Sequence, residues 1–386
     1  MKLIATFGQA LPILVAVFVA SALISLLGTP VVVRVARRFG LVDQPNHRRV
    51  NAKPIPRGGG MAVAIAFLVV ATAIVLLDEQ LDLFPDANRP ETATFLAVML
   101  GGLVAMLLGL LDDALQLRAR WQLLTQLAVA TIPIAAGIYP SVLNNPVGPG
   151  VVQLVPIAGI GFALVWILGM INSINFIDGL DGLSSGIALI AALTLGLISF
   201  TTRQSVTGQP LVGILCFVLA GALLGFLRWN FHAAKIFIGT TGVMFVGYML
   251  AILAILGAAK VAVALLVLGV PIIDTFWIII RRLATGHSPF TPDRGHIHHR
   301  LLDLGLSHAQ TVLAIYGICV VLAALSVVLS TNQQVYAFLG LAVAFGIGLF
   351  LLARGDSSAL EAETYEDLQP PTNKANGGAD MFGVRC

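Results

Sequence analysis

Two adjacent aspartates, Asp112 and Asp113, follow an apolar run and are the first residues of this sequence suited to chemistry. The carboxyl end of a helix carries partial negative charge and disfavours acids, so a pair of acids there indicates that a cation is bound nearby. Carboxylates bind Mg²⁺ through one or two oxygens and leave its other positions to water and phosphate. The pair therefore predicts a divalent-metal site, although two solvated acids at a helix end would give the same pattern.

A second group of polar residues closes a later apolar run. Its members recur every third residue and are Asn172, Asn175, Asp178 and Asp181. Consecutive members of such a series share a helix face, and the glycines that follow both aspartates indicate that the helix ends among them. Amides that join two membrane helices would explain the asparagines. They would not explain the aspartates, which are therefore candidates for a chemical role.

Asp274 is the one acid inside an apolar run, and it follows Pro271. At 1.5 Å per residue it lies about 9 Å below the inner end of the predicted helix. Acids within a membrane are costly and are by default functional. The alternative is that Asp274 pairs with a polar group of a neighbouring helix.

Histidines and arginines alternate in the polar segment that follows. The residues concerned are His287, Arg294, His296, His298, His299 and Arg300. Imidazole is a common zinc ligand, but the neighbouring arginines would repel a dication and suit a ligand that bears phosphate. A loop that only fixed the topology would be rich in Lys and Arg without the histidines.

The segment from 43 to 60 combines basic residues, among them Lys53 and Arg57, with three glycines before the next apolar run. Backbone N–H groups of glycines before a helix can approach an anion. Anchoring of the membrane topology is the better single explanation of this segment.

The composition places these groups in a membrane protein. Hydrophobic residues make up 58% of the chain and charged residues 11%, with a mean hydropathy of +0.94, whereas soluble proteins carry about 25% charged residues. Three cysteines and abundant aliphatic residues also exclude a disulfide scaffold and a disordered chain. We predict an all-α polytopic membrane protein, with one transmembrane domain over residues 1–354 and a disordered cytoplasmic tail over 355–386.

The apolar runs cover most of residues 3–353, and turn-forming segments at 144–150 and 331–334 divide the two longest. The pattern predicts about eleven transmembrane helices. Lys and Arg concentrate in alternate loops, which predicts an outer N-terminus and a cytoplasmic C-terminus in the plasma membrane. The acids and bases then share the cytoplasmic face, at headgroup depth. They suit phosphoryl transfer between a soluble substrate and a lipid phosphate.

Five ordered motifs over residues 40–310 resemble those of the polyprenyl-phosphate N-acetylhexosamine-1-phosphate transferases, the WecA/TagO branch of glycosyltransferase family 4, which is related to MraY. The motifs are residues 43–46 with 54–59, 112–113, 172–182, 271–275 and 293–300. The resemblance implies transfer of a sugar 1-phosphate, expected to be GlcNAc 1-phosphate, from a UDP-N-acetylhexosamine to undecaprenyl phosphate. It also implies release of UMP, a need for Mg²⁺ or Mn²⁺, and a role in starting a cell-envelope polysaccharide.

The resemblance also implies roles for individual residues. The catalytic residues would be Asp112, Asp113, Asp178 and Asp181, of which the first three would bind the metal. The substrate-binding residues would be Asn172, Asn175, Arg294, His296, His298, His299, Arg300, Lys53, Arg57 and Asp274. We expect no nucleic-acid partner, and the sequence leaves a homodimer open.

Two positions depart from the family's pattern. Thr240 follows Gly239 where the family has an aspartate, and a neutral hydroxyl is a poorer ligand for a hard cation than a carboxylate. Asn51 stands where the family has a histidine. Either the metal relies on the remaining aspartates, or the chain is catalytically impaired.

Two other functions stay open from the sequence. A catalytically impaired relative would bind lipid phosphate or UDP-sugar without turnover. A secondary transporter would also have many helices and intramembrane acids, but its ionisable residues should lie near the midplane of the membrane. Here they are predicted at the inner ends of helices.

Overall fold

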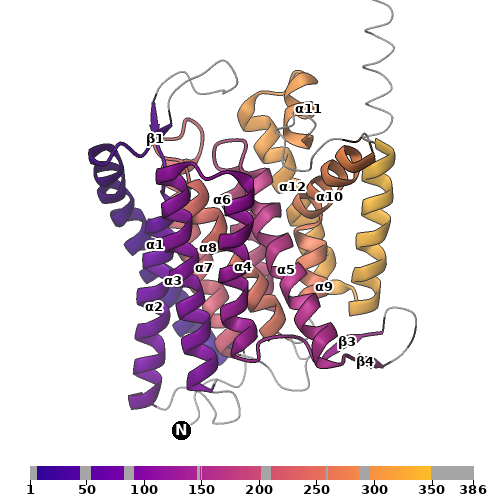
Figure 1. Ribbon diagram of the computed structural model, residues 1–386. Coiled ribbons are helices and arrows are strands. Elements are labelled where there is room, and N and C mark those ends of the chain that lie inside the picture. The colour runs from indigo at the N-terminus through magenta and orange to yellow at the C-terminus, as the bar shows by residue number, and fades with distance from the viewer. Residues whose placement is uncertain are drawn as a thin grey trace, which may run out of the picture. The chain divides into compact units, whose positions relative to one another are not determined.

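A computed structural model describes residues 7–43, 54–81, 91–145, 148, 150–200, 210–257, 260–284, 286 and 296–348. Over these residues the chain is helical, apart from turns and two short antiparallel ladders (Figure 1). The chain divides into a compact unit over residues 1–340 and a second over 341–386, of which residues 341–348 are described, as helix. The predicted tail and domain boundary lie outside the described residues and stay predictions.

The helices are α1 Phe7–Arg38, α2 Gly60–Leu81, α3 Thr92–Leu115, α4 Ala119–Ala135, α5 Pro156–Ile177, α6 Leu183–Ile198, α7 Pro210–Asn230, α8 Gly239–Leu256, α9 Lys260–Val267, α10 Gly269–Ala284, α11 Ile297–Asp303 and α12 His308–Val328. Residues 331–348 form a last helix. The ladders pair β1 Val42–Asp43 with β2 Ile55–Pro56, and β3 Val142–Asn144 with β4 Val151–Gln153.

Seven helices of the described residues are long and apolar enough to cross a membrane, or eight if α9 and α10, which are bent by 78°, count as one span. α6 is apolar but shorter. Each of the predicted spans coincides with one helix or with the bent pair. The prediction of an all-α polytopic membrane protein is therefore confirmed, while the number of crossings and the orientation stay predictions.

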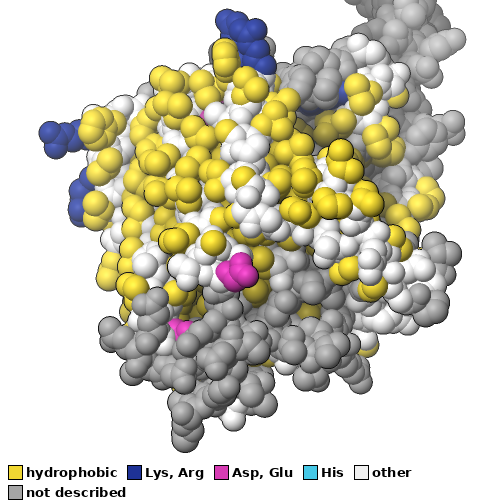
Figure 2. All heavy atoms as spheres, turned by 60° about the horizontal axis from the view of Figure 1, so that its bottom comes forward, with side chains coloured by type: hydrophobic (Ala, Val, Ile, Leu, Met, Phe, Trp, Pro, Cys, Tyr) yellow, Lys and Arg dark blue, Asp and Glu magenta, His cyan; other side chains and the backbone are white. Residues whose placement is uncertain are grey.

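Apolar side chains cover the flank of the bundle, as Figure 2 shows. On α1 a stripe of exposed aliphatic residues recurs every fourth position. Its members are Leu11, Val15, Val19, Leu23, Leu27, Val31 and Val35. Residues four apart are neighbours on a helix, and each step of four turns by about 40°, so the exposed apolar side chains wind around α1 as a continuous stripe. Lipid, rather than water, suits such a stripe.

α1 packs closely on α7 because α7 carries glycines four residues apart. A Cβ atom at Gly221 would overlap the carbonyl of Phe18, and one at Gly225 would overlap that of Ala22. Two small residues at this spacing let the backbones of membrane helices approach each other. The contact fixes the middle of α1 beside the last turns of α7.

α3, α2 and α8 meet in the same way, through glycines. A Cβ atom at Gly109 would lie 2.6 Å from the carbonyl oxygen of Thr240, and one at Gly60 would overlap the backbone of Gly242. The carboxyl end of α3 therefore lies against the amino end of α8. Most of the predicted site residues occupy this end of the bundle, near the strand β1 and the helix α11 in Figure 1.

Candidate active site

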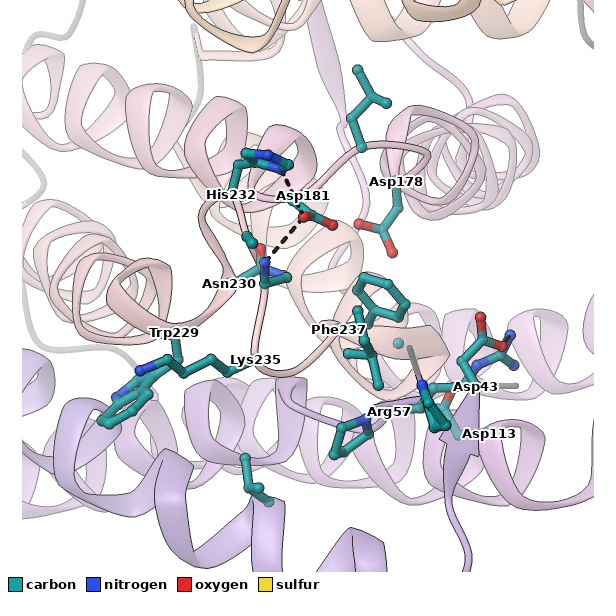
Figure 3. A pocket seen from close by; sticks show the side chains of 18 of the residues that line it. Asp43, Arg57, Asp113, Asp178, Asp181, Trp229, Asn230, His232, Lys235 and Phe237 are labelled. Carbon is teal, nitrogen blue, oxygen red and sulfur yellow. Dashed lines mark hydrogen bonds and ion pairs between the residues drawn. The ribbon is translucent and has the colours of Figure 1, made fainter. Parts of the chain in front are cut away.

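A cavity of ≈ 1070 Å³ lies at this end of the bundle, and segments far apart in the sequence line it. Its charged and histidine side chains are Arg34, Arg37, Asp43, Arg57, Asp113, Asp178, Asp181, His232, Lys235, His299 and His308. The predicted site residues that it brings together are Arg57, Asp113, Asn175, Asp178, Asp181 and His299. Figure 3 shows the acids of this cavity and their surroundings.

Asp113 holds the amino end of α8. Its Oδ1 accepts a hydrogen bond of 2.9 Å from the backbone N–H of Thr240. Its Oδ2 accepts one of 2.9 Å from the backbone N–H of Thr241 and one of 2.6 Å from the Thr241 hydroxyl. A carboxylate at the amino end of a helix satisfies free N–H groups and complements the helix dipole. Gly239 has φ +69, and a Cβ atom there would lie 2.5 Å from the carboxylate, so only glycine fits.

Asp178 directly follows α5 and faces the cavity. Its Oδ1 accepts a hydrogen bond of 2.6 Å from the Ser184 hydroxyl. The other oxygen has no hydrogen-bond partner among the residues that the structure describes. Burial raises the pKa of Asp178 to about 7, and the charges of Asp113 and Asp181 add to the increase. A carboxylate in this condition gains from a cation at its free oxygen.

Asp181 is held by groups from two other parts of the chain. Its Oδ2 accepts a hydrogen bond of 3.0 Å from the Ala234 N–H and lies 3.2 Å from Nδ1 of His232. Its backbone N–H donates to Nε2 of His308 at 2.9 Å. These contacts join the turn between α5 and α6 to the α7–α8 loop and to the start of α12.

Asp181, His232 and His308 could together hold a metal ion, since one ligand atom of each lies within 4.8 Å of the others. The lone pair of His308 Nε2 is already engaged by the Asp181 N–H. The rings of the two histidines stack with their centroids 4.5 Å apart. In this geometry the two histidines hold the turn that carries Asp181 in place.

Arg57 reaches the cavity from β2, and its guanidinium forms an ion pair with the buried carboxylate of Asp43 in β1. The two strands close the ends of the basic loop onto each other. The backbone N–H of Phe237 then donates to the carbonyl of Pro56 at 2.9 Å. Arg57 is therefore fixed at the wall, with its charge balanced by Asp43. Lys53 lies outside the described residues.

Asp112 and Asn172 are among the predicted residues that do not line the cavity. Both oxygens of Asp112 accept hydrogen bonds from the Gln122 side chain, at 3.1 and 3.0 Å, and one also accepts from Leu117 N–H. Asn172 donates to the Gln126 side chain at 2.8 Å. Asp112 thus joins α3 to α4, and Asn172 joins α5 to α4. The contact of Asn172 agrees with the alternative that its amide joins two membrane helices. The chemical roles predicted for Asp112 and Asn172 stay predictions without support from these contacts.

Asp274 lies outside the cavity as well, and it positions α11. Its Oδ2 lies 2.7 Å from Nδ1 of His296, and its Oδ1 accepts a hydrogen bond of 3.0 Å from the Ile297 N–H. The carboxylate is 1% exposed. Asp274 therefore pairs with polar groups at the start of α11, in agreement with the alternative that it contacts a neighbouring helix. Its contact with substrate stays a prediction.

The histidines of α11 differ in their surroundings. His299 lines the cavity, whereas His298 is buried and packs on the turn after Asp178, where a Cβ atom at Gly179 would overlap its ring. Neither ring nitrogen of His298 has a hydrogen-bond partner among the described residues. Burial lowers the pKa of His298 well below its usual range, so the ring is neutral. Arg300 belongs to α11 without lining the cavity, and Arg294 lies outside the described residues.

Sequence reasoning missed several residues of the cavity wall. They are Arg34, Arg37, Asn230, His232, Lys235 and His308. A usable signal was the short polar segment between the apolar runs of α7 and α8, which holds His232 and Lys235 just before Gly239. The arginines gave no signal of this kind, because basic residues after a first membrane helix are expected for topology alone.

Comparison with known proteins gives the family. Residues 95–258 match the model of glycosyl transferase family 4. A probable undecaprenyl-phosphate N-acetylglucosaminyl 1-phosphate transferase of Bacillus subtilis is 34% identical over 361 residues, which cover 92% of this chain and 94% of the relative. The chain belongs to glycosyl transferase family 4.

Other relatives of this glycosyl transferase family 4 protein agree. A decaprenyl-phosphate N-acetylglucosaminephosphotransferase of Mycolicibacterium smegmatis is 36% identical over 385 residues, with 92% and 93% of the two chains covered. An undecaprenyl-phosphate alpha-N-acetylglucosaminyl 1-phosphate transferase of Escherichia coli K12 is 30% identical over 331 residues, with 83% of each chain covered. The stretch matched by the family model runs from α3 to α8 and contains Asp113, Asp178 and Asp181. The predicted family membership is confirmed.

Proposed function

We propose that this protein transfers GlcNAc 1-phosphate from UDP-GlcNAc to a polyprenyl phosphate and releases UMP. The relatives carry names of this activity, and the transferred group and the lipid acceptor follow from those names. The observation that carries the proposal is the cavity itself. Acids from α3 and the α5–α6 turn face bases from α1 and the α7–α8 loop at one end of a membrane bundle. The ionisable residues that line it lie near the ends of helices or in the turns and loops between them, where a transporter would have them in the middle of its spans.

In the proposed reaction an oxygen of the lipid phosphate forms a bond to the β-phosphorus of UDP-GlcNAc. The bond between this phosphorus and the oxygen that bridges to the α-phosphorus breaks, and UMP leaves with the electron pair. The product is GlcNAc joined to the lipid through a diphosphate. Direct attack and passage through an aspartyl intermediate give the same products. Both bring several negative charges together, which the protein has to balance.

We propose that Asp178 and Asp181 hold Mg²⁺ or Mn²⁺. Each has one carboxylate oxygen without a hydrogen-bond partner among the described residues, and Figure 3 shows the two carboxylates turned toward one another. Oxygen ligands of this kind suit these hard cations. The ion would neutralise charge on the phosphates when bound. Asp113 suits this role less, because its oxygens already accept three hydrogen bonds.

We place the cavity on the cytoplasmic face of the plasma membrane. Support comes from the basic residues at this end of the bundle, which follow the positive-inside rule. They include Arg34, Arg37, Arg38, Arg57, Arg228, Lys235, Arg281 and Arg282. UDP-GlcNAc in the cytosol would then reach the cavity directly. A homodimer stays a prediction.

The proposal is tested with purified protein in vesicles that contain undecaprenyl phosphate, supplied with UDP-GlcNAc and Mg²⁺. We expect release of UMP, and loss of that release in Asp178→Asn. Asp303→Asn changes an exposed acid of α11 at the same end and serves as the matched control. Binding of UDP-GlcNAc without UMP release by the wild-type protein would identify a catalytically silent relative. No binding and no release would contradict the whole proposal.

A further inference from the structure

The turn between α5 and α6 carries both of the proposed metal ligands. Asp178 directly follows α5, and Asp181 stands three residues later, just before Gly182 and the start of α6. Ser184 fixes one carboxylate oxygen of Asp178, and the Ala234 N–H fixes one of Asp181. The separation of the two carboxylates depends in addition on the backbone of the turn. The groups that hold this backbone therefore control the geometry of the proposed metal site.

α12 holds the backbone of the turn at two successive residues. His308 is the first residue of α12, and its Nε2 accepts a hydrogen bond of 2.9 Å from the backbone N–H of Asp181. Tyr316 lies about two turns further along α12, and its hydroxyl donates a hydrogen bond to the backbone carbonyl of Gly182. Side chains of a helix tilt towards its amino end, which brings the Tyr316 hydroxyl back to the turn that His308 contacts.

Two glycines admit the Tyr316 hydroxyl to the start of α6. A Cβ atom at Gly186, in the first turn of α6, would overlap this hydroxyl. Gly182 has φ +80, a backbone conformation that glycine adopts readily and other residues rarely. The direction of the Gly182 carbonyl thus depends on a glycine, and the hydroxyl that binds it fits against a second one.

His308 is also linked to the side chain of Asp181, through His232. The rings of the two histidines stack with their centroids 4.5 Å apart, and Nδ1 of His232 lies 3.2 Å from Oδ2 of Asp181. An imidazole nitrogen that accepts a hydrogen bond carries no proton, and its lone pair is directed at the donor. In this arrangement His308 binds the N–H of Asp181 and leaves coordination of a metal to the carboxylates.

Resting on the proposed function, we infer that His308 and Tyr316 are positioning residues of the metal site. By holding the N–H of Asp181 and the carbonyl of Gly182, they set the separation of the two proposed ligands and with it the affinity for Mg²⁺ or Mn²⁺. Neither residue is itself a ligand. α12 is an apolar helix long enough to cross the membrane, and the inference gives its first turns a part in metal binding.

The test is the binding of Mn²⁺ to the purified protein in detergent, measured by electron paramagnetic resonance without substrates. Tyr316→Phe and His308→Leu each remove one hydrogen bond to the turn. We expect each to raise the Kd for Mn²⁺ roughly fivefold, as loss of one hydrogen bond of ordinary strength would do. His308→Gln offers an amide oxygen as the acceptor in place of Nε2, and its Kd should stay within about twofold of the wild-type value.

Tyr248→Phe is the matched control, because it removes another buried tyrosine hydroxyl. This hydroxyl donates to the carbonyls of Ala97 and Val98 in α3, at 3.5 and 3.4 Å, and has no contact with the turn. The Kd for Mn²⁺ should therefore not change in Tyr248→Phe. A purely structural role of Tyr316 would lower the amount of folded protein, and with it the number of Mn²⁺ sites, without changing the Kd. Thermal unfolding of every variant measures the retained fold.

The same shift is expected in an assay of turnover. The Mg²⁺ concentration for half-maximal UMP release should rise roughly fivefold in Tyr316→Phe. Release at saturating Mg²⁺ should return to the wild-type rate, since the variant retains both carboxylates.

Two outcomes overturn the inference while the proposed function stands. An unchanged Kd in Tyr316→Phe or in His308→Leu, together with UMP release by the wild-type protein, would remove the positioning role of that residue. Coupling of the bound Mn²⁺ to a directly bound imidazole nitrogen would make a histidine of this cluster a ligand and would also overturn the inference.

Failure of the proposed function gives a different result, because the wild-type protein would then release no UMP. The Mn²⁺ titration still decides the inference in that case, since it needs no substrate. A raised Kd in both variants supports the positioning role. Absence of Mn²⁺ binding by the wild-type protein overturns it, because there would be no metal site to position.

Discussion

Replacement of Asp113 by asparagine tests whether this residue caps α8. The carboxylate accepts hydrogen bonds from Thr240 N–H, Thr241 N–H and the Thr241 hydroxyl. An asparagine has one acceptor oxygen and presents an NH₂ group in place of the other. If the oxygen stays with Thr240, the hydroxyl can rotate to accept from the NH₂, but the N–H of the buried Thr241 loses its partner.

The size of the expected destabilisation follows from the interactions that are lost. A buried donor without a partner costs about 1–3 kcal/mol, and loss of a negative charge at the amino end of a helix costs roughly 0.3–1 kcal/mol more. Asp113→Asn should therefore lower the free energy of unfolding by about 1–4 kcal/mol. A further replacement, Thr241→Ser, keeps the backbone N–H and the hydroxyl and should change the stability much less.

The assay is unfolding in detergent with a denaturant series, in metal-free buffer so that loss of a ligand does not contribute. Asp303→Asn, at an exposed position, is the control for a simple change of charge. A value for Asp113→Asn within about 0.5 kcal/mol of the wild-type protein, the range of ordinary surface substitutions, would refute the assignment of Asp113 as the cap of α8.

Three further predictions concern the cavity wall. Burial raises the pKa of Asp178 to about 7 from its usual 3.8, so its contribution to stability is largest below pH 3.8 and is lost as the pH rises through 7. Without metal, the free energy of unfolding of Asp178→Asn, relative to that of the wild-type protein, should therefore increase from pH 5 to pH 8 by roughly 1–2 kcal/mol after allowance for water in the cavity. Thermal unfolding of both proteins at pH 5 and pH 8 measures this change, and a difference in stability that is the same at both pH values would contradict the prediction. Thr240→Asp adds a carboxylate to the wall and should lower the Mg²⁺ concentration for half-maximal UMP release severalfold; an unchanged concentration would show that position 240 is not at the metal. The added Cβ of Gly179→Ala would overlap His298, and this variant should reduce UMP release at least tenfold. The control is Gly169→Ala in α5, where no atom lies within 4 Å of the added Cβ, and it should retain activity. Equal activities of the two variants would show that the packing of α11 on the turn is unimportant.

The helices could be predicted from the sequence because length and hydropathy alone define a membrane span. The bend between α9 and α10 could not, since the apolar run continues through it. The clustering of acids at one end of the bundle was also predictable, because alternate ends of successive spans share one side of the membrane.

The different roles of the individual aspartates could not be predicted from the sequence. Asp112 and Asp113 are neighbours in sequence, and successive residues on a helix point about 100° apart. One therefore faces α4 and the other faces α8 and the cavity. Likewise the series from Asn172 to Asp181 turns around the helix, so that Asn172 contacts α4 while Asn175 and Asp178 reach the cavity. Identical residue types thus have different roles, which depend on the neighbouring helix.

Lys235 shows why the basic side of the cavity escaped prediction. It lies in the short loop between α7 and α8, where a lysine is explained by membrane topology alone. Its chemical environment depends on Trp229, and Trp229 is held by a carbonyl of α1 that lies more than 200 residues earlier in the chain. A contact of this kind follows from helix packing and leaves no local pattern.

The central claim is that the β-phosphate of UDP-GlcNAc passes to the lipid together with the sugar. It is tested most directly with UDP-GlcNAc labelled with ³²P in the β-phosphate, undecaprenyl phosphate and Mg²⁺. Chromatography then separates the lipid product from the released nucleotide. We predict that the label appears in the lipid and that unlabelled UMP is released, with both lost in Asp178→Asn. Label in released UDP, or no label in the lipid, would contradict the account.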